Sequence, residues 1–306
     1  MGSGTWSSRA FSSYSDDNDL TYKGINDTFQ STAVDSNLHI NTPRKYASSA
    51  ADVSPQMLKV GVRECIENEE HPITTPIIIA FDVTGSMGEI PHMMIQKYLP
   101  KLMDTLKEMT IPNPQLLFMA IGDHYTDDYP VQVGQFESDT IKIAESLRSI
   151  YIEQGGGGNN GESYSLAHIV AGYHTELDCY HKRKAKGFLF TIGDEPNHPV
   201  IESRGLIRSL QYESGVEDLS QEEALRKAQE QYHVFHIHVK DGYHRYSAMW
   251  ESLLGTDHVL KCLSEDICTE ISKTIYKYTS HEEDVDVETS TPADEYLTSE
   301  GKHPFY

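Results

Sequence analysis

Short apolar runs alternate with amphipathic segments along the middle of the chain, between residues 77 and 279. Apolar runs of this length are typical of buried strands, and apolar residues three or four positions apart are typical of helices packed on a sheet. The repeated alternation predicts a three-layer, Rossmann-like α/β domain with a mostly parallel sheet of about six strands and helices on both faces. We expect strands at 77–81, 115–121, 131–136, 188–192 and 234–239.

Helical periodicity fills the intervals between these runs. The apolar positions from Ile90 to Leu106 recur at helical spacing, with Pro100 expected to kink that helix. The segment 131–136 alternates apolar and polar residues, which predicts an antiparallel edge strand beside 115–121. Ser220 and Glu223 match a capping box at a helix start. The other helices are expected at 140–151, 163–174, 220–232 and 265–278.

The ends of the chain differ in texture from this middle region. Residues 1–50 form a polar leader expected to be extended or disordered, although its aromatic residues are spaced like anchors that could order it on the main domain or a partner. Residues 51–76 read as a lead-in with a short helix around 55–67. Residues 280–306 form an acidic C-terminal tail. The α/β domain is thus expected to span 77–279.

The first apolar run ends in Asp82, Thr84 and Ser86, at alternate positions around Gly85. A carboxylate and two hydroxyls on a loop leaving a buried strand offer hard oxygen ligands, which suit Mg²⁺, Mn²⁺ or Ca²⁺ better than Zn²⁺. The alternative is that the three side chains only cap the next helix, because all three residue types are favoured there.

Further polar residues follow later strands of the predicted sheet. A glycine-rich run, GGGGNNGES, occupies residues 155–163, Asp123 follows the second strand, and Asp194 ends the run 187–194. Ligands in such folds bind at the carboxyl ends of the parallel strands, so these residues should reach one edge together with Asp82. A turn aspartate that satisfies backbone amides is an equally good interpretation of Asp123.

The order and spacing of these motifs resemble the von Willebrand factor A (VWA) domain with its metal-ion-dependent adhesion site (MIDAS). The resemblance covers residues 73–279 and is greatest to the subgroup with DVTGSM and a GGGxxxE loop. It implies that Thr84 and Ser86 bind the cation, with Asp82 and Asp194 binding it directly or through water. The Thr that the family supplies from its second loop is missing here, so that role would fall to Asn159, Asn160 or Glu162. Asp123 would lie at the rim of the site.

Composition restricts the classes of partner. The formal net charge of −22 argues against a nucleic-acid-binding face, which needs clustered Lys and Arg. No apolar stretch approaches the ~18 residues that span a bilayer, and no secretory signal is evident. The four cysteines are widely spaced, as expected of free thiols in a reducing cytoplasm.

These observations favour a binding module that is not an enzyme. Sequence signatures of an acyl-transfer nucleophile, a zinc-protease helix and a phosphate loop are missing. The resemblance implies a bound Mg²⁺, with Mn²⁺ or Ca²⁺ as alternatives, that captures an Asp or Glu of a partner protein. One alternative is a structural component of a larger complex with a degenerate metal site. Another is a regulatory partner of a MoxR- or chelatase-type ATPase, and a metal-dependent hydrolase ranks last.

Overall fold

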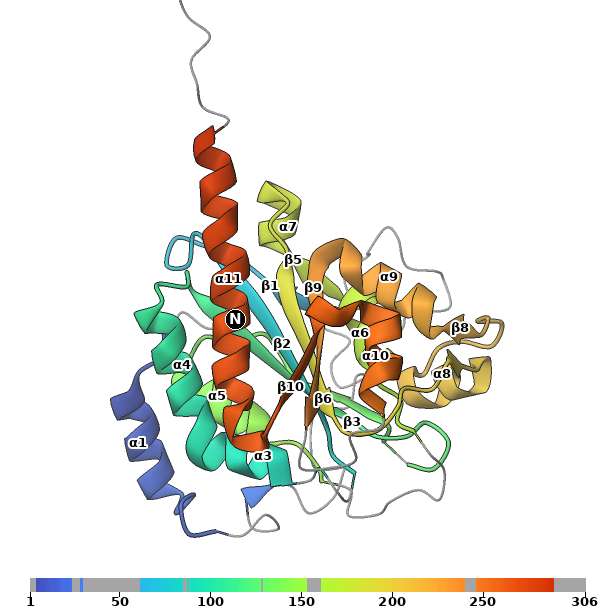
Figure 1. Cartoon of the computed structure of the whole chain (residues 1–306). Helices are drawn as coiled ribbons and strands as arrows, with labels where there is room; N and C mark the ends of the chain where they lie inside the picture. The colour runs from blue at the N-terminus through green and yellow to red at the C-terminus, as the bar shows by residue number, and fades with distance from the viewer. Residues whose placement is uncertain are drawn as a thin grey trace, which may run out of the picture.

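A six-stranded sheet with the order β10-β9-β6-β2-β3-β4 forms the centre of the molecule (Figure 1). The computed structural model describes residues 4–23, 28–29, 61–84, 87, 89–127, 129–152, 161–239 and 246–288. Neighbouring strands are parallel except β3 and β4, which are antiparallel. The predicted mostly parallel sheet with one antiparallel edge strand is therefore confirmed. The strands are β2 (Thr75–Asp82), β3 (Pro114–Ile121), β4 (Val131–Val133), β6 (Gly187–Gly193), β9 (Tyr232–Val239) and β10 (Val259–Cys262).

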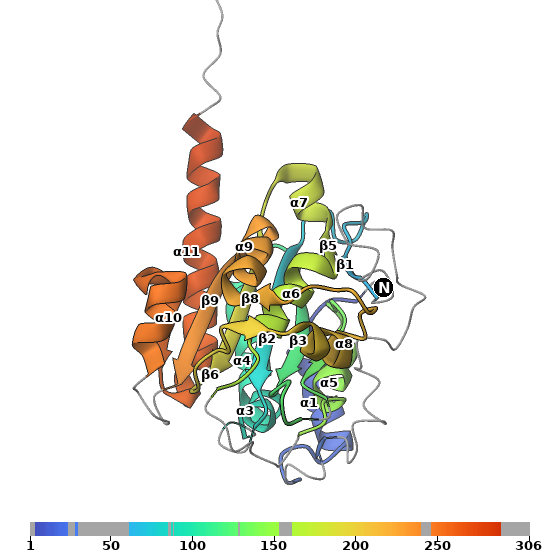
Figure 2. The ribbon, with the colours of Figure 1, turned by 90° about the vertical axis from the view of Figure 1, so that its right-hand side faces the viewer.

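Helices cover both faces of this sheet, as the views in Figures 1 and 2 show. Successive side chains of β2 point to opposite faces: Ile77 and Ile79 join one hydrophobic core and Ile78 joins the other. The first core is covered by α1 (Ser8–Asp17), α4 (Leu99–Glu108), α5 (Thr140–Arg148) and α11 (Ile267–Glu288). The second is covered by α6 (Ser165–Tyr173), α8 (Ser203–Leu210), α9 (Gln221–Gln231) and α10 (Ser247–Leu254).

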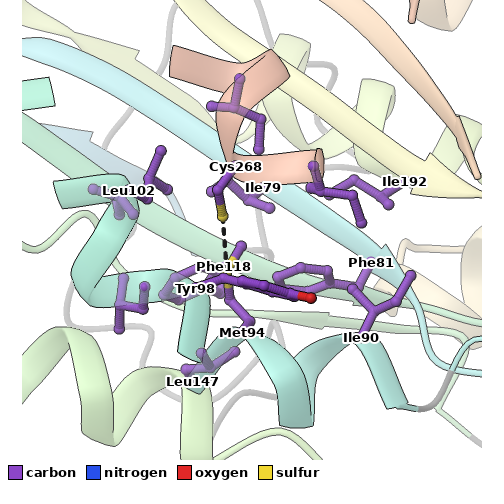
Figure 3. Close-up of a cluster of buried hydrophobic side chains, with 14 of the residues drawn as sticks. Ile79, Phe81, Ile90, Met94, Tyr98, Leu102, Phe118, Leu147, Ile192 and Cys268 are labelled. Atoms are coloured by element: carbon purple, nitrogen blue, oxygen red, sulfur yellow. Dashed lines mark hydrogen bonds between the residues drawn. The ribbon is translucent and has the colours of Figure 1, made fainter. Parts of the chain in front are cut away.

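The first core fixes the end of β2 from which the candidate site begins. Phe81 of β2 stacks on Phe118 of β3 with ring centroids 5.8 Å apart, above the helical segments that follow β2 (Figure 3). Those segments are α3 (Glu89–Met93), a π-helical stretch (Met94–Tyr98) and α4. The expected kink at Pro100 stays a prediction. The structure has a π-helical stretch directly before α4, and Pro100 lies in the first turn of α4.

The expectation of an extended or disordered leader is wrong over residues 8–17, which form the helix α1 and lie against the domain, as the alternative of anchoring aromatic residues predicted. Ser7, the N-cap of α1, donates its backbone N–H to Thr140 Oγ1 over 2.8 Å, and Ser138 Oγ donates to the Gly4 carbonyl over 2.7 Å. The Trp6 and Phe11 rings are 5.3 Å apart and buried in the first core, whereas Tyr22 is exposed. Residues 24–27, 30–60 and 289–306 lie outside the described part of the chain, so the proposed division into leader, domain and tail stays a prediction.

The prediction of a helix around 55–67 is wrong for residues 61–67, the part of that range that the structure describes. Arg63–Cys65 form a strand, β1, parallel to β5 (Thr175–Leu177). The cause is tertiary: Arg63 is buried and donates Nε to the Gly134 carbonyl over 2.9 Å, and that contact comes from a distant part of the chain. Residues 55–60 lie outside the described residues.

Smaller elements also complete the structure. α7 (Asp178–Arg183) follows β5, and β7 (Val200–Ile201) pairs antiparallel with β8 (Leu219–Ser220). The capping box predicted at Ser220 and Glu223 is present at the start of α9. Over the described residues, the helices are too short or too polar to cross a bilayer.

Candidate metal-binding edge of the sheet

Three aspartates lie where three neighbouring strands end. Asp82 is the last residue of β2 and pairs in register with Ile121, the last residue of β3, so Asp123 follows two residues beyond that level. Phe81 pairs with Ile192 of β6, and Asp194 follows the end of that strand. All three side chains are buried. The parallel register therefore brings to one edge the carboxylates that the sequence places far apart.

Asp82 is held by hydroxyl and amide donors. Its Oδ1 accepts the Thr84 backbone N–H over 2.8 Å and the Thr84 hydroxyl over 2.6 Å, and its Oδ2 accepts the Tyr164 hydroxyl over 2.8 Å. Burial raises the pKa of Asp82 to about 6, and the negative charge of Asp194 acts in the same direction against these hydrogen bonds. Burial thus makes the charged form of Asp82 less favourable than it is in water.

Tyr164 reaches Asp82 because residue 193 is glycine. Tyr164 is fully buried at the N-terminal end of α6, and a Cβ atom on Gly193 would overlap its hydroxyl. This close approach of backbone to ring requires the absence of a side chain at Gly193. Burial raises the pKa of Tyr164 well above its usual value, so the phenol is a hydrogen-bond donor to Asp82.

Glu162 lies near enough to Asp82 and Asp123 to feel the charge of each. Its backbone N–H donates to the Pro196 carbonyl over 2.9 Å, and its own carbonyl accepts the His198 N–H over 3.1 Å, which fix the segment in place. The side chain is buried, and among the described residues its Oε2 has no hydrogen-bond partner. Burial raises the pKa of Glu162 to about 10, with contributions from the charges of Asp82 and Asp123. This carboxyl group is thus neutral at pH 7 in the absence of a cation.

Asp123 is surrounded differently, by a ring nitrogen and a tight turn. Its Oδ1 accepts the Tyr125 backbone N–H over 3.0 Å and lies 3.0 Å from His198 Nε2. Its Oδ2 accepts the Thr126 hydroxyl over 3.3 Å. The turn interpretation of Asp123 is therefore supported by these bonds. The side chain also takes part in a cluster that the sequence did not indicate.

His124 connects this cluster to two further elements. Its Nδ1 lies 2.7 Å from Ser163 Oγ, and its Nε2 lies 3.0 Å from Glu202 Oε2. Tyr125 donates its hydroxyl to Glu202 Oε1 over 2.6 Å. Burial lowers the pKa of His124, so the neutral imidazole is favoured. Partial burial acts to raise the pKa of Glu202, but the hydrogen bonds from Tyr125 and His124 prevail and lower it to about 2.

Asp123, His124 and His198 together could hold a metal ion. One ligand atom from each lies within 4.8 Å of the other two, and all three side chains are buried. His124 Nδ1 lies 3.8 Å from Asp123 Oδ1. A group of side chains suited to a metal ion therefore lies at the carboxyl edge of the sheet.

The sequence-predicted residues divide into two groups. Asp82, Thr84, Asp123, Glu162 and Asp194 meet at this edge. Ser86, Asn159 and Asn160 lie outside the described residues, so their predicted roles stay predictions. Sequence reasoning did not single out Tyr164, His198 or Glu202. His198 could have been found as a histidine in the loop after Asp194, because that loop follows a strand that ends at the same edge.

Comparisons with known proteins identify no family for this chain. No family model matches the sequence, and no curated protein matches it. Solved structures with a distant likeness include a pilus adhesin, SpaC, from Lactobacillus rhamnosus GG, at 9% identity and a TM-score of 0.42, over 71% of this chain and 31% of the adhesin. Another is the conserved hypothetical protein BatB from Bacteroides thetaiotaomicron, at 16% identity and a TM-score of 0.39, over 67% of this chain and 99% of BatB.

A third is proximal thread matrix protein 1 from the mussel byssus, at 14% identity and a TM-score of 0.39, over 67% of this chain and 46% of that protein. The match thus spans about a third of the adhesin and just under half of the byssus protein.

Proposed function

We propose that this chain is a divalent-metal-dependent protein-binding module that captures an acidic group of a partner protein. One observation carries the proposal: Asp82, Asp194 and Glu162 are buried carboxyl groups at one edge, and Glu162 Oε2 has no hydrogen-bond partner among the described residues. A buried carboxylate without a partner is costly, and a bound cation is one of the ways in which proteins stabilise such a group. Burial, together with the negative charge of neighbouring carboxylates, also raises the pKa values of Asp82 and Glu162.

The residues fit a hard cation. Asp82, Thr84, Asp194 and Glu162 present oxygen atoms, and Ser86, Asn159 and Asn160 on the adjoining loops would add more. Oxygen ligands of this kind suit Mg²⁺, with Mn²⁺ or Ca²⁺ as alternatives. Mg²⁺ keeps exchangeable water when few protein ligands bind it, and a partner carboxylate can replace one such water. The resemblance to the VWA domain with a MIDAS, noted from the motifs, supports the same assignment.

The charge of the chain restricts the partner. With a formal net charge of −22, the chain repels an acidic protein at long range. A partner should therefore present its Asp or Glu within a basic surface, which would steer the encounter. Nucleic acid and lipid headgroups, which carry negative charge without such a surface, are poor candidates.

Enzymatic turnover is not part of the proposal. Ser163, His124 and Glu202 form a hydrogen-bonded series that resembles an acyl-transfer triad. The Ser163 side chain is fully buried, and its Oγ already accepts the His124 backbone N–H over 2.9 Å, so no substrate carbonyl reaches it. A structural component with a degenerate metal site, or a regulatory partner of a MoxR- or chelatase-type ATPase, is the alternative that a partner search would reveal.

The test combines metal titration with partner capture. Calorimetry with Mg²⁺, Mn²⁺ and Ca²⁺ should show binding to the wild-type chain and none to Asp82→Ala, while Asp257→Ala, which removes an exposed carboxylate, binds as the wild type does. A protein captured from the native source should be retained with Mg²⁺ and released by chelator. Unchanged Mg²⁺ binding by Asp82→Ala would refute the site, and retention in chelator would favour the structural alternative.

A further inference from the structure

We propose that Asp123, His124 and His198 form a second metal site, suited to a borderline transition metal such as Zn²⁺. The three side chains are buried, and their ligand atoms lie within 4.8 Å of one another. Two of the three donors are ring nitrogens, which Zn²⁺ favours and Mg²⁺ does not. The inference goes beyond the proposed function and does not depend on it, because Asp82 and Asp194 take no part in this site.

The distances between the donor atoms are those of a compact site. His198 Nε2 and His124 Nδ1 lie 3.0 Å and 3.8 Å from Asp123 Oδ1. Donors at the bond lengths of tetrahedral zinc, about 2.0–2.2 Å, lie about 3.3 Å apart, so small side-chain adjustments would accommodate the ion. Three protein ligands leave a fourth position for water or for a group of a bound partner.

Glu202 supplies an independent indication. A metal-binding histidine usually donates its second ring N–H to a carboxylate, which fixes the ring and its tautomer. His124 Nε2 lies 3.0 Å from Glu202 Oε2, and Tyr125 holds the other oxygen of that carboxylate over 2.6 Å. With Nε2 as the donor, His124 Nδ1 carries a lone pair, which faces Ser163 Oγ over 2.7 Å and lies 3.8 Å from Asp123 Oδ1. The ring is also packed closely, because a Cβ atom on Gly205 of α8 would overlap it.

Ser163 occupies the position that the metal would take on His124. Its hydroxyl lies 2.7 Å from His124 Nδ1 and also accepts the His124 backbone N–H over 2.9 Å. Coordination at Nδ1 requires the Ser163 oxygen to move away, because a zinc ion about 2.0–2.1 Å from Nδ1 would overlap it. Both hydrogen bonds between Ser163 and His124 are then given up in exchange for the metal bond. The exchange therefore involves rotation of the Ser163 side chain about its Cα–Cβ bond.

The decisive experiment is a Zn²⁺ and Co²⁺ titration of the full-length chain, freed of metal and then saturated with Mg²⁺ to fill the oxygen-rich edge. We expect one Co²⁺ per chain, with an absorption spectrum that reports nitrogen ligands in a tetrahedral field. Glu202→Ala, which removes the carboxylate that accepts the His124 ring N–H, should weaken Zn²⁺ binding by roughly 10–100-fold. His198→Gln, which keeps a hydrogen-bonding group near Asp123 but loses the imidazole, should weaken it further.

Two controls separate this site from the magnesium edge and from chance binding to histidine. His181→Gln, which removes an exposed histidine on α7, should bind Zn²⁺ as the wild type does. Asp82→Ala should lose Mg²⁺ and keep Zn²⁺. Circular dichroism confirms that each variant is folded, and His124→Gln replaces His198→Gln if the latter is not. Zn²⁺ binding that is unchanged in the folded variant of His198 or His124, or a wild-type chain that binds no Zn²⁺, would overturn the proposal.

Discussion

Asp82 and Asp123 follow neighbouring parallel strands and are both buried, yet their surroundings differ in kind. Asp82 receives hydrogen bonds from Thr84 and Tyr164 and lies near the charge of Asp194. Asp123 contacts the His198 ring and accepts a hydrogen bond from the backbone N–H of Tyr125 in its own turn. The same position on a sheet edge therefore produces an oxygen-rich site in one case and a site containing nitrogen in the other.

This difference arises in the loops and not in the strands. The strands β2 and β3 deliver a carboxylate each to the edge, while the partners come from the start of α6, the loop after β6 and the segment before α8. A sheet of this type fixes where a ligand can bind, and the neighbouring connections decide its chemistry. Substitutions at the two aspartates should accordingly have opposite consequences.

The largest effect is expected for Asp82→Asn. Its folded-state pKa of about 6 exceeds the ordinary value of 3.8, so the metal-free fold loses stability as pH rises from about 4 through 6. That difference corresponds to about 3 kcal/mol as an upper bound, and asparagine removes it. In chelator at pH 7.5 the variant should be more stable than the wild type by up to this amount. In Mg²⁺ the order should reverse, because the wild type alone gains binding energy.

Urea unfolding of both proteins, with chelator and with saturating Mg²⁺, measures this reversal. The same comparison at pH 4 serves as the control, since Asp82 is then protonated in the folded state and about half protonated in the unfolded state, so little of the metal-free difference should remain. A variant that is less stable than the wild type in chelator at pH 7.5 would show that Asp82 is stabilising without a cation.

Asp123→Asn should act in the opposite direction in the absence of metal. The carboxylate accepts bonds from the Tyr125 amide and the Thr126 hydroxyl and lies 3.0 Å from His198 Nε2. Weakening these charge-assisted bonds should lower the free energy of unfolding by about 1–2 kcal/mol at pH 7.5 in chelator. The measurement is the same urea titration. If Asp82→Asn and Asp123→Asn changed the free energy of unfolding in the same direction in chelator at pH 7.5, the two sites would not differ in the way described.

The sequence was sufficient for five of the six strands of the central sheet, all but β10, and for the aspartates that follow three of them. Each of these signals is local: an apolar run followed at once by polar residues marks both a strand and its end, as in 77–82 and 187–194. Because parallel strands end at one edge, the meeting of Asp82, Asp123 and Asp194 could be predicted without any knowledge of distances.

The partners of these aspartates could not be predicted, because they depend on contacts between distant segments. Tyr164 begins an apolar helix and reads as a core residue, and its bond to Asp82 depends on glycine at position 193. Glu202 meets His124 through the placement of α8. The strand β1 was misassigned for the same reason, since its partner β5 lies more than 100 residues along the chain.

The smallest expected effect tests the hydroxyl that distinguishes the Asp82 site, in Tyr164→Phe. The hydrogen bond from Tyr164 lowers the pKa of Asp82, so its loss should raise that pKa further above its ordinary value. The variant should therefore be destabilised by about 1 kcal/mol more at pH 8, where Asp82 is ionised, than at pH 5. Tyr232→Phe is the matched control, because it removes an equally buried hydroxyl whose partner, Thr175, is neutral. Its cost, measured by urea unfolding, should be the same at both pH values, and a Tyr164→Phe cost that is equally constant would show that the Tyr164 hydroxyl does not sense the charge of Asp82.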